Sequence, residues 1–386
     1  MYQIKTLNKI SKIGLERFDD KYTCADDFDA PDAIMVRSAS MHDMEMPASL
    51  LAIARAGAGV NNIPCDKCAE DGIVVFNTPG ANANAVKELV LASMLMCSRK
   101  VIPAIEWAKT LKGNGAEVGK MVEKGKSAFA GPEIMGKKLG VIGLGAIGIL
   151  VANAANALGM TVYGYDPYLS VDSAWKLSRH IKHSADMTEI FKECDYITIH
   201  VPLTPDTKGF INAESIATMK DGVRILNFAR GDLVDSGAVI DALANGKIAA
   251  YVTDFPNDDL IGVDGVIAIP HLGASTAESE ENCAVMAADE IKEYLENGNI
   301  INSVNMPNVA MPRSTAIRVC VIHKNVPNML TQISGVFSAC NINIEKLNNQ
   351  SKKDFAYTML DVDSADDKLI ADIKAIEGVI RIRVIK

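Results

Sequence analysis

The sequence predicts an α/β protein of 386 residues, with two parallel-sheet domains and a smaller C-terminal βαββαβ domain. Short apolar runs alternate with helix-compatible segments up to about residue 77 and again from Lys137. Such alternation is typical of parallel sheets covered by helices. Between Asn302 and Ser314 two prolines and no periodicity predict a linker before the C-terminal domain.

Composition and charge exclude several classes of protein. Hydrophobic residues make up 48% of the chain and charged residues 23%, as in ordinary globular proteins. The net charge of −9 and the 5% of aromatic residues argue against a nucleic-acid-binding surface. Residues 139–165 carry no charge, but glycines and asparagines interrupt them, so we expect no membrane span.

The N-terminus and the cysteines indicate the compartment. The N-terminus has no long apolar core and no small-residue cleavage site, so we expect no secretory signal. Eight scattered cysteines fit a reducing, cytoplasmic setting. Among the cysteines, only Cys65 and Cys68 have the Cys-x-x-Cys spacing of metal ligands. No second pair of ligands accompanies them, so we expect no metal site.

The order of elements follows from the apolar runs. The first domain has four strand-like runs, which are YQIKTL, AIMVRS, LAIARAGAGV and GIVVFN. Helical patterning covers residues 84–112, and the Lys- and Gly-rich residues 112–126 predict a loop. Six further strand-like runs are KKLGVIG, TVYGYD, DYITIHV, RILNFA, KIAAYVTD and GVIAIPH. A helix is expected over 276–297, followed after the linker by the βαββαβ pattern, which is ferredoxin-like.

A glycine-rich turn, G-x-G-x-x-G, runs from Gly143 to Gly148 between a predicted strand and an amphipathic helix. Gly143 allows the tight turn, Gly145 lets backbone N–H groups approach a pyrophosphate, and Gly148 lets the helix pack on the strand. Asp166 ends the next strand, where it would bind ribose hydroxyls and repel a 2′-phosphate. The pattern predicts a Rossmann-type domain that binds NAD rather than NADP; the alternative is a glycine turn that binds nothing.

Three polar residues follow later strands at their C-terminal ends, namely Arg230, Asp254 and His271. Ligands of such sheets bind at that edge. A histidine can accept a hydroxyl proton and an arginine can bind a carboxylate, so this set would suit hydride transfer from a 2-hydroxy acid. Asp258 and Asp259 lie in a predicted loop that could fold back to orient His271. Taken singly, a histidine at a strand end is more often structural.

Five motifs occur in an order that resembles the D-isomer-specific 2-hydroxyacid dehydrogenases: LGVIGLGAIG, VYGYDP, HVPLTPDTKGFIN, NFARGDLVD and PHLGAST. RAGAGVNNI, NTPGANANAVKELV and the C-terminal unit are similar to the members that oxidise 3-phosphoglycerate, and that unit resembles an ACT domain. The resemblance implies a flavodoxin-like substrate domain (1–92 and 282–303), a Rossmann-type NAD domain (93–281), a linker (304–315) and an ACT-like regulatory domain (316–386).

The resemblance also implies roles for single residues. Arg230 would bind the substrate carboxylate and C2 oxygen, and His271 would be the acid/base. The implied NAD contacts are Gly143, Gly145, Ala146, Ile147, Gly148, Asp166, His200, Val201, Pro202, Thr207, Phe228, Ala229, Arg230, Asp254, His271 and Gly273. The family's glutamate before a proline, the partner of the histidine, is missing here. A count without a gap from Asp254 reaches Asp259, with Asp258 as the alternative.

The phosphate of 3-phospho-D-glycerate needs cations of its own. Arg37 and Arg55 end N-terminal strands, and a glycine-rich turn beside them offers backbone N–H groups. The expected substrate-binding residues are Arg37, Arg55, Ala58, Gly59 and Asn61. The alternative is that each arginine is a surface charge.

The C-terminal unit is implied to bind L-serine between paired domains through His323, Asn325 and Asn343; the alternative is a dimerisation module without a ligand. Asn328 replaces a glycine usual in that turn, and asparagine tolerates positive φ. We therefore expect NAD-dependent oxidation of 3-phospho-D-glycerate to 3-phosphooxypyruvate, the first step of L-serine biosynthesis, in a homodimer or homotetramer. The alternatives are another D-2-hydroxyacid dehydrogenase, such as a glyoxylate or hydroxypyruvate reductase, and an NAD-sensing binding protein.

Overall fold

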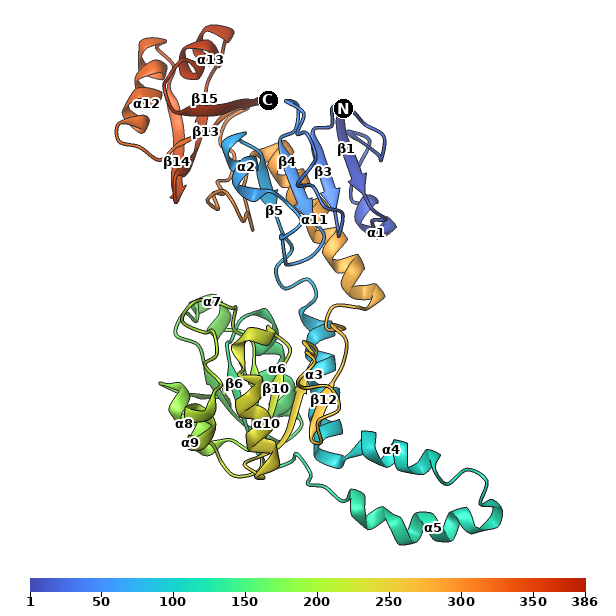
Figure 1. Cartoon of the computed structure of the whole chain (residues 1–386). Coiled ribbons are helices and arrows are strands. Elements are labelled where there is room, and N and C mark those ends of the chain that lie inside the picture. Colours follow the sequence, from blue (N-terminus) through green and yellow to red (C-terminus); the bar gives the residue numbers. More distant parts are fainter. The chain divides into compact units, whose positions relative to one another are not determined.

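The structure, a computed structural model, describes all residues from 1 to 386. The chain divides into two compact units, residues 1–81 with 277–386 and residues 82–276 (Figure 1). It leaves the first unit just before α3 (Ala83–Arg99) and returns to it where α11 (Ala277–Asn297) begins. The boundaries expected at 92 and 282 fall inside these two helices, because helical periodicity does not show which unit a helix packs against.

A five-stranded parallel sheet forms the centre of the first unit, in the flavodoxin-like order β2-β1-β3-β4-β5. The predicted strands are present, and β2 is an addition that carries a single buried side chain. The elements are β1 (Tyr2–Leu7), α1 (Lys12–Leu15), β2 (Tyr22–Ala25), β3 (Ala33–Val36), β4 (Ala52–Arg55), α2 (Cys65–Glu70) and β5 (Val74–Phe76).

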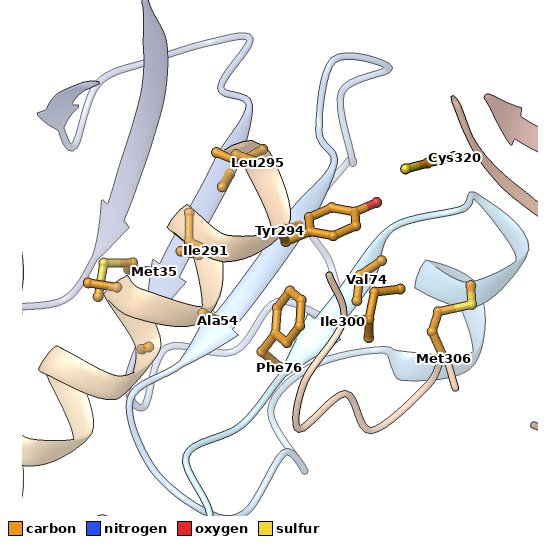
Figure 2. Packing of buried hydrophobic residues seen from close by; sticks show 14 of the residues in the cluster. Met35, Ala54, Val74, Phe76, Ile291, Tyr294, Leu295, Ile300, Met306 and Cys320 are labelled. Atoms are coloured by element: carbon orange, nitrogen blue, oxygen red, sulfur yellow. The ribbon is translucent and has the colours of Figure 1, made fainter. Parts of the chain in front are cut away.

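Helix α11 packs on this sheet. Its Ile291 and Tyr294 are buried among side chains of the strands, including Met35 and Phe76 (Figure 2). The rings of Phe76 and Tyr294 are 5.8 Å apart between centroids. The helix expected over 276–297 is therefore confirmed, and it completes the core of a domain whose strands lie about two hundred residues earlier in the chain.

The C-terminal domain (residues 316–386) has the predicted βαββαβ order, with an antiparallel sheet arranged β14-β15-β13-β16. Asn328 has φ 71°, as its tolerance of positive φ predicts. The elements are β13 (Ile317–Lys324), α12 (Met329–Ala339), β14 (Ile344–Lys352), β15 (Phe355–Val362), α13 (Asp367–Lys374) and β16 (Val379–Ile385).

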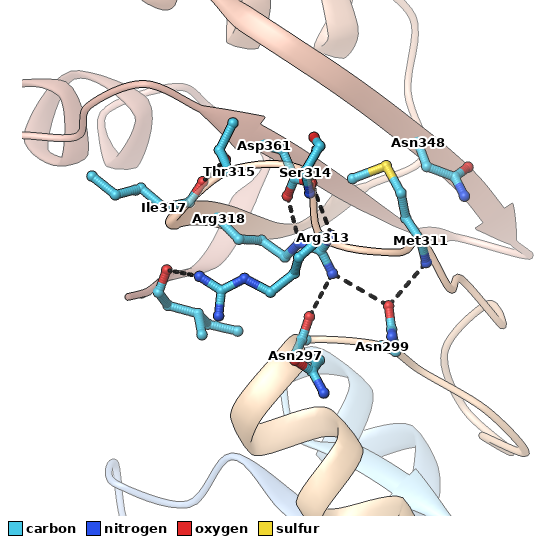
Figure 3. A network of polar contacts seen from close by, with 12 residues as sticks. Asn297, Asn299, Met311, Arg313, Ser314, Thr315, Ile317, Arg318, Asn348 and Asp361 are labelled. Atoms are coloured by element: carbon cyan, nitrogen blue, oxygen red, sulfur yellow. Dashed lines mark hydrogen bonds and ion pairs between the residues drawn. The ribbon is translucent and has the colours of Figure 1, made fainter.

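This domain is bonded to the end of α11. Arg383 donates to the carbonyl oxygens of Tyr294 (3.2 Å) and Leu295 (3.0 Å). Arg318 donates to the carbonyl oxygen of Asn297 at 2.8 Å (Figure 3). The last carbonyls of a helix have no partner within the helix, so arginines of the C-terminal domain satisfy the end of α11.

A seven-stranded parallel sheet forms the second unit, in the order β12-β11-β10-β9-β6-β7-β8. The order reverses between β6 and β9, which is the Rossmann-type arrangement with its switch point beside β6. The elements are β6 (Lys138–Ile142), α6 (Ala146–Ala157), β7 (Thr161–Tyr165), α7 (Val171–Ala174), β8 (Lys182–His183), α8 (Met187–Glu193), β9 (Tyr196–Ile199), α9 (Ala213–Thr218), β10 (Val223–Asn227), η3 (Gly231–Leu233), α10 (Ser236–Ala244), β11 (Ile248–Thr253) and β12 (Val266–Ala268).

The prediction of a loop over residues 112–126 is wrong. Helix α4 (Val101–Lys109) is followed by η1 (Gly115–Glu117), α5 (Val118–Gly125) and η2 (Lys126–Phe129). Two Glu–Lys pairs spaced three residues apart support these turns. The ring of Trp107 covers Gly125, where a Cβ would lie 2.3 Å from the ring. The glycine that suggested a loop is therefore needed for this contact with the Trp107 ring. No helix of the chain has the length and apolar character that crossing a membrane requires.

Candidate active site

The glycine-rich turn joins β6 to α6, and close backbone contacts require two of its glycines. Gly143 has φ 94°, and a Cβ there would lie 2.6 Å from the carbonyl oxygen of His200. A Cβ on Gly148 would lie 1.9 Å from the carbonyl oxygen of Gly143. Real Cβ atoms do not approach oxygens this closely, so the turn can take this form only with glycine at both positions.

Gly145 has a different role, because nothing lies within 4 Å of the position a Cβ would take. It is the N-cap of α6, and no side chain caps the helix. The first N–H groups of α6, which include those of Ala146 and Ile147, are therefore left for an external acceptor. An open approach to an uncapped helix N-terminus fits the pyrophosphate of NAD.

Asp166 lies just beyond β7 and is held by two backbone bonds. Its Oδ2 accepts from the Leu144 N–H at 2.8 Å, and its Oδ1 accepts from the Tyr168 N–H at 2.8 Å. A carboxylate can accept about four hydrogen bonds, so acceptor sites remain for both ribose hydroxyls. Pro167 and Tyr168 supply no cation for a 2′-phosphate. This arrangement fits NAD rather than NADP.

His200 follows β9 and is uncharged near neutral pH, because burial lowers its pKa to about 3. Its Nε2 shares a hydrogen bond with Thr198 Oγ1 at 2.9 Å. Its Nδ1 is buried and has no partner. An unpaired buried nitrogen is costly. The carbonyl oxygen of His200 lies against Gly143 of the turn.

The remaining predicted NAD contacts follow β9 and β10, and they are Val201, Pro202, Thr207, Phe228 and Ala229. Thr207 Oγ1 donates to the Pro202 carbonyl oxygen at 2.7 Å and accepts from the Thr204 N–H at 2.8 Å, so this loop is closed on itself. The Ala229 N–H donates to Asn227 Oδ1 at 3.2 Å. The structure gathers these loops at the same sheet edge as the glycine turn.

Arg230 and His271 end at that edge with free functional groups. Arg230 is exposed, and its Nη1 donates only to the carbonyl oxygen of Ala229, at 2.7 Å. His271 is exposed, and its ring lies against Phe255 with centroids 4.7 Å apart. Neither forms an ion pair within the chain. Phe255 was not predicted; its position directly after Asp254, at a strand end, is a signal that could have identified it.

Asp254 is the buried carboxylate of the site. It is 1% exposed, and neither of its oxygens has a well-formed hydrogen bond. Burial raises its pKa, and the charges of His271 and Arg230 act in the opposite direction. A Cβ on Gly273 would lie 3.4 Å from its Oδ2, so the backbone of Gly273 borders the carboxylate.

Asp258 and Asp259, the two candidates for the partner of His271, are exposed in the loop after Asp254. Neither is hydrogen-bonded or ion-paired to His271. The structure therefore does not bring either carboxylate to the imidazole, and their role stays a prediction.

In the first unit, Arg37 directly follows β3 and Arg55 is the last residue of β4, and these strands pair in register at their ends. Arg55 Nε donates to the carbonyl oxygen of Arg37 at 3.1 Å. A Cβ on Gly57 would lie 2.4 Å from Arg55 Nη1, so the guanidinium lies over the glycine-rich turn. The five residues expected to bind substrate are thus brought together: Arg37, Arg55, Ala58, Gly59 and Asn61.

Arg37 has a partner that was not predicted. Its Nη2 is 2.5 Å from Oε1 of Glu280, in the first turn of α11. Both side chains are nearly half exposed, and ion pairs of that kind are weak. The ion pair with Glu280 is therefore weak, and the Arg37 guanidinium can exchange this partner for another anion.

The predicted effector residues of the C-terminal domain differ in exposure. His323 is 2% exposed, and its ring nitrogens bond to the carbonyl oxygen of Lys324 (2.8 Å) and to Thr358 Oγ1 (2.9 Å). Burial lowers its pKa. Asn325 donates to the Lys353 carbonyl oxygen at 2.9 Å, and both Asn325 and Asn343 are exposed.

Comparison with known proteins covers nearly the whole chain. Residues 91–273 match the D-isomer specific 2-hydroxyacid dehydrogenase NAD-binding domain, and residues 319–381 match the AHAS small subunit-like ACT domain. D-3-phosphoglycerate dehydrogenase of Haemophilus influenzae is 35% identical over 89% of this chain and 83% of its own. Hydroxypyruvate reductase of Thermotoga maritima is 39% identical over 68% of this chain and 85% of its own. The NAD+-bound 3-phosphoglycerate dehydrogenase of Entamoeba histolytica superposes with a TM-score of 0.59 at 25% identity, covering 79% of this chain and 98% of that one.

Proposed function

The chain belongs to the D-3-phosphoglycerate dehydrogenase family of D-isomer-specific 2-hydroxyacid dehydrogenases, and we propose that it oxidises 3-phospho-D-glycerate at C2 to 3-phosphooxypyruvate. This reaction is the first step of L-serine biosynthesis. The observation that carries the proposal is the pair of free side chains, Arg230 and His271, at the sheet edge that holds the NAD turn.

In the proposed reaction, the His271 imidazole accepts the proton of the C2 hydroxyl while the C2 hydride leaves. The chemistry that NAD supplies when bound is acceptance of that hydride. The exposed guanidinium of Arg230 binds the substrate carboxylate and offsets its charge. The ring of Phe255 orients the imidazole by packing against it.

A carboxylate is needed to stabilise the imidazolium that forms. Asp259 remains our proposed partner, with Asp258 as the alternative, because both side chains are exposed in the loop that follows Asp254. Asp254 contributes a buried carboxylate; burial raises its pKa, and the charges of His271 and Arg230 act to lower it. Its part is cofactor contact at the Gly273 backbone.

The substrate phosphate is bound by Arg37 and Arg55 in this proposal. A phosphate carries more charge than the Glu280 carboxylate and offers three oxygens, so it displaces Glu280 from Arg37. The N–H groups of the turn after β4 add neutral donors. This set distinguishes the phosphorylated acid from hydroxypyruvate or glyoxylate, the substrates of the alternative family members.

The test is NADH formation by the purified chain with NAD and 3-phosphoglycerate, beside glycerate, D-lactate and, in reverse, hydroxypyruvate. We expect turnover with the phosphorylated acid, loss of at least ~100-fold in kcat for His271→Gln, and unchanged NADH affinity in that variant. Faster turnover of hydroxypyruvate would indicate a reductase, as in the Thermotoga relative. Tight NADH binding without turnover of any acid would indicate an NAD sensor.

We further propose that the ACT-like domain binds L-serine and that the protein is a homodimer or homotetramer. Strand β14 is an edge of its sheet, so a second copy could continue the sheet there. Light scattering on the purified protein gives the oligomer, and serine inhibition of NADH formation tests the effector. All eight cysteines are free, which supports a cytoplasmic location.

A further inference from the structure

The glycine-rich turn after β4 is held by two residues that directly follow β5, and neither has been given a role above. The backbone N–H of Thr78 donates to the carbonyl oxygen of Gly57 at 3.2 Å. The side-chain amide of Asn77 donates, through Nδ2, to the carbonyl oxygen of Ala58 at 2.5 Å. Strands β4 and β5 are neighbours in the sheet, so the turn is fastened to the end of the adjacent strand.

These two bonds determine the direction of two N–H groups in the turn. The peptides are trans, and in a planar trans peptide the N–H points opposite to the C=O. The C=O of Gly57 shares its peptide with the N–H of Ala58, and the C=O of Ala58 shares its peptide with the N–H of Gly59. Because both carbonyls point to the end of β5, both N–H groups point away from it.

Both N–H groups are free to bind a ligand. Neither donates to any group of the chain, and Ala58 is exposed while Gly59 is half-buried. The Arg55 guanidinium lies on the same turn, where its Nη1 is 2.4 Å from the position of a Cβ on Gly57 and 3.8 Å from that of a Cβ on Gly59. Free N–H donors beside a guanidinium suit an anion.

We infer that Asn77 is a positioning residue for substrate binding. Its amide fixes the peptide between Ala58 and Gly59, and this directs the Gly59 N–H at an anionic group of the substrate. The inference rests on the proposed function, because 3-phosphoglycerate supplies that anion as its phosphate or as its carboxylate. Asn77 itself acts through the turn and does not touch the substrate.

The turn needs such a restraint because of its composition. Glycine has more backbone freedom than any other residue, and Gly57 and Gly59 lie on either side of Ala58. Without the bond from Asn77, the peptide between Ala58 and Gly59 can rotate and turn its N–H away from the ligand. Thr78 restrains the preceding peptide through its backbone, so only the bond from Asn77 can be removed by a side-chain substitution.

The first experiment measures the binding of 3-phosphoglycerate to the full chain by isothermal titration calorimetry. Asn77→Leu nearly preserves the size of the side chain and removes its donor. We expect the dissociation constant to rise about tenfold, as for the loss of one hydrogen bond to a charged group. Asn77→Gln keeps an amide donor and should bind more tightly than Asn77→Leu. NADH affinity should be unchanged in both variants.

Asn348→Leu is the matched control. Asn348 Nδ2 also donates to a backbone carbonyl oxygen, that of Ala310 at 3.3 Å, but it lies on β14 of the C-terminal domain. Its loss should leave the affinity for 3-phosphoglycerate unchanged. Equal affinity of wild type and Asn77→Leu for 3-phosphoglycerate, or an equal loss in Asn348→Leu, would overturn the inference.

The second experiment observes the Gly59 N–H directly, by NMR of the full chain labelled with ¹⁵N-glycine. Gly59→Ala identifies the resonance, and this substitution fits because a Cβ on Gly59 has no neighbour closer than 3.7 Å. We expect 3-phosphoglycerate to shift the Gly59 amide proton in wild type, and to shift it less in Asn77→Leu at saturation. No shift in wild type would overturn the inference, and that result does not depend on the folding of any variant.

Inorganic phosphate and glycerate show which anionic group the turn receives. If Asn77→Leu weakens inorganic phosphate and spares glycerate, the turn binds the substrate phosphate; the opposite result assigns the turn to the carboxylate. Neither experiment uses turnover. A chain that binds 3-phosphoglycerate through the turn and does not oxidise it would therefore contradict the proposed function only.

Discussion

Replacing Arg318 with methionine removes the positive half of a buried ion pair. Arg318 and Asp361 are both 0% exposed, and they are joined by Nε–Oδ1 at 2.6 Å and Nη2–Oδ2 at 3.0 Å (Figure 3). The same guanidinium donates to the Asn297 carbonyl oxygen at the end of α11. Methionine keeps the length of the side chain and loses every donor.

The expected loss is about 4 kcal/mol in the free energy of unfolding of the C-terminal domain, since leaving one buried charge unpaired costs about 3–5 kcal/mol. Ser314 still donates to Asp361 Oδ2 through its N–H (2.8 Å) and its hydroxyl (3.0 Å), which limits the loss. The double variant Arg318→Met/Asp361→Leu buries no charge, and we expect it to recover at least half of the loss.

The assay is urea unfolding followed by far-UV circular dichroism and by limited proteolysis of the C-terminal domain. Arg313→Met, an arginine in the same segment that donates to backbone carbonyls, is the matched control and should change stability little. A double variant no more stable than the single one would refute the reasoning, because the unpaired charge would then not be the cause.

The pH dependence adds a second check. Burial acts to raise the pKa of Asp361, but the bonds from Arg318 and Ser314 hold it below its usual value. Without Arg318 that pKa rises, so the carboxyl becomes neutral in mild acid. The deficit of Arg318→Met should therefore shrink between about pH 7 and about pH 5. A constant deficit would contradict this account.

Other predictions concern single sites. Gly143→Ala should lower the unfolding free energy of the second unit by about 1–3 kcal/mol. Gly145→Ala should leave this free energy unchanged and weaken NADH binding, measured by fluorescence. Loss of stability in both variants would contradict the open approach at Gly145. Burial raises the pKa of Glu290 to about 8, above its value of 4.5 in the unfolded chain, so stability falls as pH rises between these values. Glu290→Gln should lose this dependence in melting curves, and an unchanged pH profile would contradict it. Glu280→Gln should lower KM for 3-phosphoglycerate about 2- to 5-fold by freeing Arg37; a higher KM would show that Glu280 positions Arg37 instead.

Sequence alone predicted the parts of the fold that a local pattern specifies. The turn from Gly143 to Gly148 could be assigned because each glycine has a steric reason within a few residues. The strand β2 was missed because four residues with one buried side chain hold too little periodicity. Helix α5 was missed because the contact that explains Gly125 comes from Trp107.

The site was predicted unevenly for the same reason. Arg230 and His271 end apolar strands, so the common edge of a parallel sheet follows from their positions. The contact of Glu280 with Arg37 joins residues far apart in the sequence, and no local sequence pattern predicts it. Oε2 of Glu290 lacks a hydrogen-bond partner because of the residues that surround it in the folded chain, and neither composition nor motif spacing predicts those neighbours.

The path of the chain through its two units determines the order in which they can be completed during synthesis. Residues 82–276 form a continuous unit, and all of its strands have been made once Thr276 leaves the ribosome. The first sheet, made earlier, still lacks α11, so Met35 and Phe76 have no cover until Ile291 and Tyr294 are added. The nascent chain therefore holds an uncovered apolar sheet while the nucleotide-binding unit is made. A stall of synthesis before α11 would leave a chain that can fold its NAD turn and is prone to aggregate through its N-terminal strands.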